Sequence, residues 1–120
     1  VQIRHQTVRD DFAEQAAATL AGEGVSVEVI DVRSLSLIDY ETIGESVKKT
    51  GRVVIVEEGP KTGGVSAEIA AGISERFGRD LRVPIVRVAS ADVPVPFSPV
   101  LENLYRPDRD QIVRGIRQVL

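Results

Sequence analysis

Apolar and polar residues alternate along this 120-residue chain with two different periods. Short runs rich in valine and isoleucine are typical of strands, and longer stretches with apolar residues every three or four positions are typical of helices. The short runs predict strands at 1–4, 25–32, 52–56 and 85–89. The longer stretches predict helices at 8–21, 39–50, 64–77 and 108–120.

The ends of these elements carry suitable residues. Asp39 is a plausible helix N-cap, and Gly22 and Gly24 end the first helix. The run RVVIV at 52–56 is continuously apolar after its arginine, which favours a central parallel strand covered on both faces. Three prolines in the 91–99 segment exclude a regular interior helix or strand there.

Strands that alternate with helices of 10–15 residues predict an α/β domain. Its sheet should be parallel or mostly parallel, with helices on both faces. The length fits a single domain spanning 1–120, which is large enough to fold without disulfides. The sequence shows no internal repeat, linker or low-complexity segment.

Composition excludes several classes of site and partner. With no cysteine and one histidine, His5, the chain has no disulfide, zinc–thiolate site, cysteine nucleophile or multi-histidine metal cage. The net charge of −3 is spread over interleaved acidic and basic residues, which argues against a nucleic-acid partner. No apolar run approaches the roughly 20 residues of a membrane span, and the first residues lack the apolar core of a signal peptide.

We expect a soluble, cytoplasmic, bacterial domain with no nucleic-acid or membrane partner. Because methionine is absent even at position 1, we expect the chain to begin inside a longer protein or to be processed. His5 could act as a general base, but its place at the end of a short strand favours an ordinary edge histidine.

A glycine-rich turn at 59–64 joins the apolar strand to the third helix. Backbone N–H groups at such a helix start can bind phosphate. The spacings G-x-x-x-x-G-K-[ST] and G-x-G-x-x-G are both absent, and Pro60 removes one donor. The turn is therefore predicted to be a strand-to-helix elbow, with an anion or a partner's carboxylate bound near Gly63 and Gly64 as the alternative.

Glu57 and Glu58 follow the apolar strand, at the edge where open α/β sheets place ligands. Neighbouring strand residues point to opposite faces, so these carboxylates cannot act together as an acid–base pair. We expect one of them to form a salt bridge and the other to be solvated.

Two further segments favour contact over chemistry. The apolar, proline-rich segment DVPVPFSP at 92–99 includes Pro96 and Phe97, and it can cover its own sheet edge or contact another molecule.

The last segment carries Arg106, Arg109, Arg114 and Arg117. Aspartates interrupt these arginines, and we expect most of them on a solvated helix face. No nucleophile–base pair, metal set or cofactor loop is complete, so the residues alone do not name a reaction.

Five phrases stand in unbroken order along most of the chain. They are EVIDVRSLSLID (28–39), ESVKKTGRVVIVEEGPKTGG (45–64), SAEIAAGI (66–73), PIVRVASADVPVPFSP (84–99) and the closing RPDRDQIVRGIRQVL. Together they resemble the C-terminal transketolase-type domain. The resemblance is closer to that domain in the beta subunit of thiamine-diphosphate-dependent dehydrogenases of pyruvate or branched-chain 2-oxo acids, or of acetoin.

The resemblance implies a three-layer α/β/α sandwich with a mixed, mostly parallel sheet of about five strands, one of them an antiparallel edge strand. It implies a parent enzyme that decarboxylates a 2-oxo acid on thiamine diphosphate with magnesium and acylates a lipoyl group. The cofactor would lie between the alpha subunit and the amino-terminal, pyrimidine-binding domain of the beta subunit, which is absent from this chain. This domain alone would bind no cofactor or metal and would carry no catalytic residue.

The implied partners are the alpha subunit, a second beta subunit and the subunit-binding domain of the lipoyl acyltransferase. The alternatives are a stand-alone anion-binding or regulatory domain of the same fold, and the C-terminal domain of a transketolase. The candidate interface or docking residues are Glu57, Glu58, Thr62, Gly63, Gly64, Asp80, Arg82, Pro96, Phe97 and Leu120.

Arg82 marks a departure from the family. It stands where the resemblance often implies an acid that helps to dock the acyltransferase's basic peripheral domain, and Asp80 could substitute from two residues away. An arginine at that position would repel a basic partner. Leu120 lies about where family members end.

Overall fold

The computed structural model describes residues 2–5, as backbone, and residues 11–120. The described elements are β1 (Gln2–His5), α1 (Asp11–Ala21), β2 (Val29–Val32), α2 (Tyr40–Thr50), β3 (Val54–Pro60), α3 (Val65–Phe77), β4 (Val86–Ser90), α4 (Pro99–Tyr105) and α5 (Arg109–Arg117). Among the helices described, none combines the length and the apolar character needed to cross a membrane.

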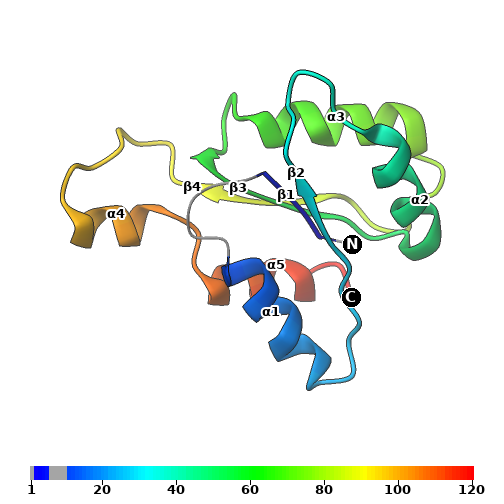
Figure 1. The fold of residues 1–120 in the computed structure, drawn as a ribbon, viewed down its shortest axis with the longest axis horizontal. Helices are drawn as coiled ribbons and strands as arrows, with labels where there is room; N and C mark the ends of the chain where they lie inside the picture. The colour runs from blue at the N-terminus through cyan, green and yellow to red at the C-terminus, as the bar shows by residue number, and fades with distance from the viewer. Residues whose placement is uncertain (1, 6–10) are drawn as a thin grey trace.

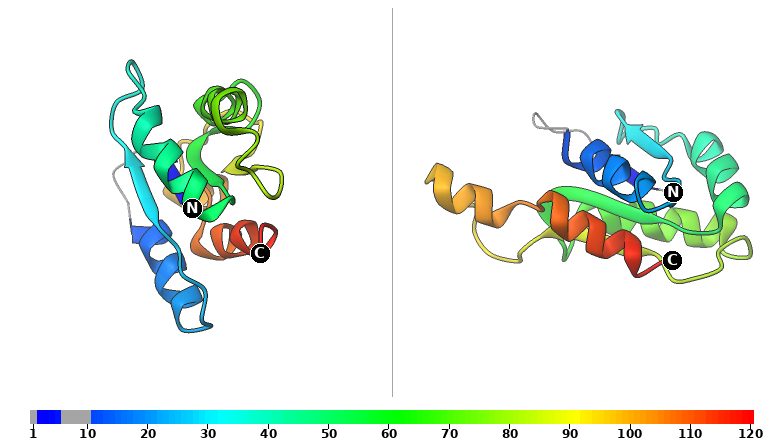
Figure 2. Two further views of the ribbon diagram at one scale, coloured as in Figure 1. Left: turned by 90° about the vertical axis from the view of Figure 1, so that its right-hand side faces the viewer. Right: turned by 90° about the horizontal axis from the view of Figure 1, so that it is seen from below.

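One parallel sheet, in the strand order β2-β1-β3-β4, lies between two helical layers (Figure 1). Helices α2 and α3 cover one face, and α1 and α5 cover the other (Figure 2). Neighbouring residues of β3 show the arrangement directly, because Ile55 packs in the α2–α3 core and Val54 in the α1–α5 core. Burial on both faces explains why this strand is continuously apolar.

Two clusters of buried residues hold the layers together. The first consists of Val32, Ile43, Val47, Val53, Ile55, Ile69 and Ile73. The second consists of Ala16, Leu20, Val54, Ile112, Val113, Ile116 and Val119. Each fully buried Val, Leu or Ile contributes about 1.5–3 kcal/mol relative to an exposed one. The apolar faces predicted for the helices therefore stabilise the packing of the helices on the sheet.

The predicted α/β class with a parallel sheet is confirmed. The predicted mixed sheet of about five strands is wrong for the described residues, which form four strands, all parallel. The chain returns through α1, α2 and α3 between successive strands, and helical crossovers of this kind join parallel strands. The hydrophobic pattern by itself indicated four strands, and the antiparallel fifth came from the family resemblance.

Several elements differ from the prediction. Strand β3 begins at Val54, two residues later than predicted, and extends to Pro60, so it includes Glu57 and Glu58. The strand predicted from residue 25 begins at Val29, where its pairing with the described part of β1 starts and runs over four pairs from Gln2–Val29 to His5–Val32. Helix α4 was not predicted, because the prolines of this segment argued against a regular helix. Pro99 lies in the first turn of α4, where a helix tolerates proline.

Candidate functional site: the glycine turn and the apolar arm

The glycine turn, residues 59–64, starts in the last two residues of β3 and leads into α3, beside the point where the strand order reverses. The chain runs from β1 outward to β2 and then back across to β3 and β4. In open α/β sheets the carboxyl edge at such a switch point is the usual place for a ligand. The turn therefore occupies the right place for a site, and its contacts decide whether it can bind anything.

The start of α3 is filled by a carboxylate of the chain itself. Glu57 is 4% exposed, and its two carboxylate oxygens accept hydrogen bonds from the Ser66 backbone N–H at 2.7 Å and from the Ser66 hydroxyl at 3.0 Å. A carboxylate here satisfies a helix-start N–H and lies at the positive end of the helix dipole. Glu57 thus takes the position that a bound anion would need. This contact favours the interpretation of the turn as a strand-to-helix connection over that of an anion-binding site.

The last two glycines of the turn have different roles. Gly63 has φ of +71°, with nothing near the position of an added Cβ, so it serves the left-handed backbone. Gly64 has an ordinary extended backbone, but a Cβ there would overlap Glu57 Oε1 and the Pro60 carbonyl oxygen. Gly64 therefore provides the space in which the Glu57 carboxylate lies.

Glu58 points to the opposite face from Glu57, as predicted for neighbouring strand residues. Its Oε1 lies 3.8 Å from one guanidinium nitrogen of Arg106, and the other terminal nitrogen of that guanidinium lies 3.7 Å from Glu102. The expected salt bridge is confirmed at Glu58, while the expectation that the other glutamate is solvated is wrong, because Glu57 is buried and bonded to α3. Arg106 is also mostly covered, with 18% of its side chain exposed, whereas the other three arginines are exposed as predicted.

Thr62 ties the turn to the segment after β4. Its backbone N–H donates to Asp92 Oδ1 at 2.9 Å, and its hydroxyl donates to Asp92 Oδ2 at 2.6 Å. The Ser90 hydroxyl donates to the Glu58 carbonyl oxygen at 2.6 Å and closes the same corner. The hydrogen bonds from Thr62, first from its hydroxyl and then from its backbone, hold the pKa of Asp92 below its usual 3.8.

This pairing gives a pH prediction. Since the folded-state pKa is lowered, the Thr62–Asp92 contact is fully present above about pH 4 and is lost as the pH falls through the lower folded-state value. In an NMR titration, the Asp92 carboxyl carbon should have its midpoint below 3.8, and the midpoint should move back toward 3.8 in Thr62→Val. Thr62→Ser keeps the hydroxyl and should titrate like the wild type; a Thr62→Val midpoint equal to the wild-type value would contradict the pairing.

We define residues 93–104, from the loop after β4 into the last turn of α4, as the apolar arm. Its exposed apolar residues are Val93, Val95, Phe97, Val100, Leu101 and Leu104. Helix α4 buries none of its residues and lies away from the sheet (Figure 1). Phe97 is fully exposed and does not itself cover the sheet edge, whereas Pro96 beside it is half-buried.

The ten predicted interface residues fall into two groups. The first group belongs to segments at the carboxyl ends of β3 and β4 and consists of Glu57, Glu58, Thr62, Gly63, Gly64, Pro96 and Phe97. Asp80, Arg82 and Leu120 lie at the other end of the sheet, where Arg82 and Leu120 line one cavity of about 380 Å³. Arg82 donates its backbone N–H to the Gly51 carbonyl oxygen at 2.8 Å, and its side chain is exposed.

Two further predictions concerned His5 and a possible metal site. His5 ends β1, and its side chain lies outside the described part of the chain. Within the described part, no group of three His, Cys, Asp or Glu side chains is placed to hold a metal ion. Sequence reasoning missed Ser66 as the partner of Glu57; the available signal was a serine in the first turn of the helix that follows a strand-end glutamate.

The model of the transketolase C-terminal domain family matches residues 11–112. This chain belongs to that family. The domain is 47% identical over 105 residues to the pyruvate dehydrogenase E1 component subunit beta-2, chloroplastic, of Arabidopsis thaliana, covering 88% of this chain and 26% of that protein. It is 41% identical over 108 residues to the acetoin:2,6-dichlorophenolindophenol oxidoreductase subunit beta of Cupriavidus necator, covering 90% of this chain and 32% of that protein.

A further relative and one solved structure extend the comparison. The pyruvate dehydrogenase E1 component subunit beta of Leifsonia xyli is 44% identical over 108 residues, covering 90% of this chain and 32% of that protein. A structure described as a split gene transketolase, inactive beta4 tetramer, superposes with a TM-score of 0.81 at 31% identity, covering 99% of this chain and 37% of that chain. The resemblance to beta subunits is confirmed, and the domain spans about a quarter to a third of the length of these curated relatives.

Proposed function

We propose that this chain is the C-terminal assembly and partner-docking domain of the beta subunit of a thiamine-diphosphate-dependent dehydrogenase of a 2-oxo acid or of acetoin. The parent enzyme would oxidatively decarboxylate a 2-oxo acid and acylate a lipoyl group. Beta subunits of pyruvate dehydrogenase and of an acetoin oxidoreductase are the relatives that support this proposal. The transketolase alternative has the support of one solved structure at lower identity.

The apolar arm is the observation that carries the assembly role. Six exposed apolar side chains on one short, projecting segment are more than scattered surface residues, and patches of this kind mark interaction sites. Covering each large side chain in a partner would contribute on the order of 1.5–3 kcal/mol. The arm is therefore built for contact with another chain.

The described residues do not fit the cofactor. A diphosphate needs free N–H donors, and the start of α3, where such donors would lie, already holds the Glu57 carboxylate. We assign thiamine diphosphate and magnesium to other parts of the parent enzyme. The same contact at Glu57 removes the support for a stand-alone anion-binding domain.

The proposed partners follow from the arm and from the relatives. The alpha subunit or a second beta subunit would cover the arm, and the relative named as a beta4 tetramer supports contacts between beta-type chains. The subunit-binding domain of a lipoyl acyltransferase would dock elsewhere on the surface. The exposed Asp80 and Arg82 remain our candidates for that contact.

A chimeric enzyme tests the proposal. The segment of the Cupriavidus necator beta subunit that matches this chain is replaced by the chain, and the remaining subunits of that enzyme are supplied. We expect acetoin-dependent reduction of 2,6-dichlorophenolindophenol to be retained. A control chimera carries the matching segment of the Leifsonia xyli beta subunit. An inactive test chimera beside an active control chimera would contradict the proposed function.

A further inference from the structure

We propose that the outer edge of β4 binds an extended, acidic segment of another protein, which adds to the sheet as a further strand. The proposal is independent of the assembly role of the apolar arm. It rests on the hydrogen-bonding pattern of the edge, on the groove around it and on the charges of the groove.

The edge itself is open in the described part of the chain. Strand β4 is last in the sheet order, and Val86 donates its N–H inward to the Val53 carbonyl oxygen at 3.1 Å. Because backbone groups alternate in direction along a strand, the N–H and C=O groups of Arg87 and Ala89 face outward. A row of such groups is a template for pairing with an extended chain.

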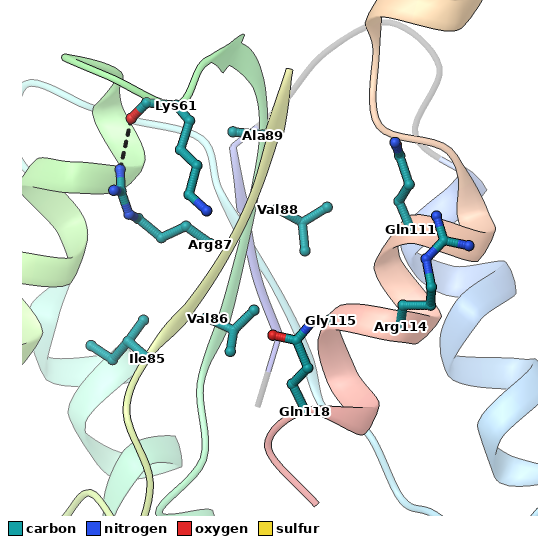
Figure 3. A pocket seen from close by; sticks show the side chains of 10 residues that line it. All are labelled: Lys61, Ile85, Val86, Arg87, Val88, Ala89, Gln111, Arg114, Gly115 and Gln118. Carbon is teal, nitrogen blue, oxygen red and sulfur yellow. Dashed lines mark hydrogen bonds between the residues drawn. The ribbon is translucent and has the colours of Figure 1, made fainter. Parts of the chain in front are cut away.

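A groove of about 550 Å³ follows this edge. Figure 3 shows that Val86 and Val88 point toward α5, while Ile85 and Arg87 lie on the other side of the strand. The α5 wall carries Gln111, Arg114 and Gln118 (Figure 3). The strand edge is thus the floor of the groove, with side chains rising on both sides.

The groove is cationic although the chain as a whole is acidic. Lys61 and Arg87 stand on one wall and Arg114 on the other, and no carboxylate is among the described residues that line it. A guanidinium nitrogen of Arg87 donates to the Lys61 carbonyl oxygen at 2.8 Å, which fixes that wall. Asp92, whose carboxylate the Lys61 charge also favours, is held by Thr62.

These charges select the occupant. Successive side chains of an added strand project to opposite faces, so adjacent acidic residues would reach Arg114 on one wall and Arg87 with Lys61 on the other. Pairing of two copies of this chain through β4 would instead bring like charges together, and charged edge residues are a common barrier to such self-association. An acidic partner segment therefore fits better than a second copy.

The test uses a defined peptide, acetyl-TVEDVEDVT-amide, and its neutral counterpart, acetyl-TVQNVQNVT-amide. In NMR titrations of the ¹⁵N-labelled chain, the acidic peptide should shift the amide signals of Arg87 and Ala89 and slow their hydrogen exchange. The neutral peptide should bind more weakly. Arg114→Glu should weaken binding of the acidic peptide about fivefold, in line with about 1 kcal/mol for an exposed charge contact.

Arg79→Glu is the matched control, because Arg79 is an exposed cation that does not line the groove. Binding to this variant should equal binding to the wild type. The proposal would be overturned by the absence of shifts at millimolar acidic peptide, by equal binding of the two peptides, by shifts centred away from β4, or by self-association through β4.

Discussion

Gly64→Ala should destabilise the domain by about 3 kcal/mol and lower its melting temperature by about 12 °C. The added methyl group would overlap the Pro60 carbonyl oxygen, which is backbone and cannot move away cheaply. It would also overlap Glu57 Oε1 and force that buried carboxylate away from Ser66. Thermal unfolding followed by circular dichroism measures the loss.

Gly63→Ala is the matched control for this substitution. Gly63 has open space around it and a positive φ, so alanine there should cost only about 1 kcal/mol, the usual penalty of the left-handed conformation. Equal losses at the two positions would mean that Gly64 is required for its backbone alone, and would contradict its role as the space for Glu57.

Glu57→Ala should also cost about 3 kcal/mol, because it leaves the buried N–H and hydroxyl of Ser66 without an acceptor. Glu57→Gln keeps the shape and one acceptor oxygen, and it should cost about half as much. Denaturant unfolding compares the two variants with the wild type. A Glu57→Ala variant as stable as the wild type would show that the carboxylate does not stabilise the start of α3.

The same substitution should open the helix start to an external anion. Formate has the chemistry of the missing carboxylate, and it should stabilise Glu57→Ala by about 1.4 kcal/mol at tenfold excess over its dissociation constant. The wild type should gain nothing beyond the general effect of salt, measured with chloride. Equal stabilisation of both proteins by formate would contradict occupation of the helix start by Glu57.

Local pattern and capping residues predicted much of the fold. The four-residue spacing of Val65, Ile69 and Ile73 marks α3, and two of these three residues are fully buried. Asp39 caps α2 as predicted, accepting the Thr42 N–H at 3.0 Å. These features depend on neighbours close in sequence, which is why the sequence alone reveals them.

The candidate site depended on contacts that no local pattern encodes. Glu57 was expected either to form a salt bridge or to be solvated. It is buried, and its carboxylate accepts hydrogen bonds from Ser66, nine residues later in the sequence. Thr62 meets Asp92 across 30 residues in the same way. The fifth, antiparallel strand was inferred from the family and not from the chain's own pattern, and the described residues do not form it.

We propose that this domain acts through the apolar arm and not through chemistry at the glycine turn. Phe97→Asp with Leu104→Asp tests it in the chimeric beta subunit, since both side chains are exposed and the substitutions should change the domain's own stability by no more than about 0.5 kcal/mol. Ala18→Asp, on an exposed position of α1, adds one such charge outside the arm as a control.

Sedimentation velocity of the chimeric enzyme is the most direct measurement. The unsubstituted chimera and the Ala18→Asp control should sediment as the full assembly, and the Phe97→Asp, Leu104→Asp variant should dissociate into smaller species. Sedimentation of the arm variant as the full assembly would contradict the account.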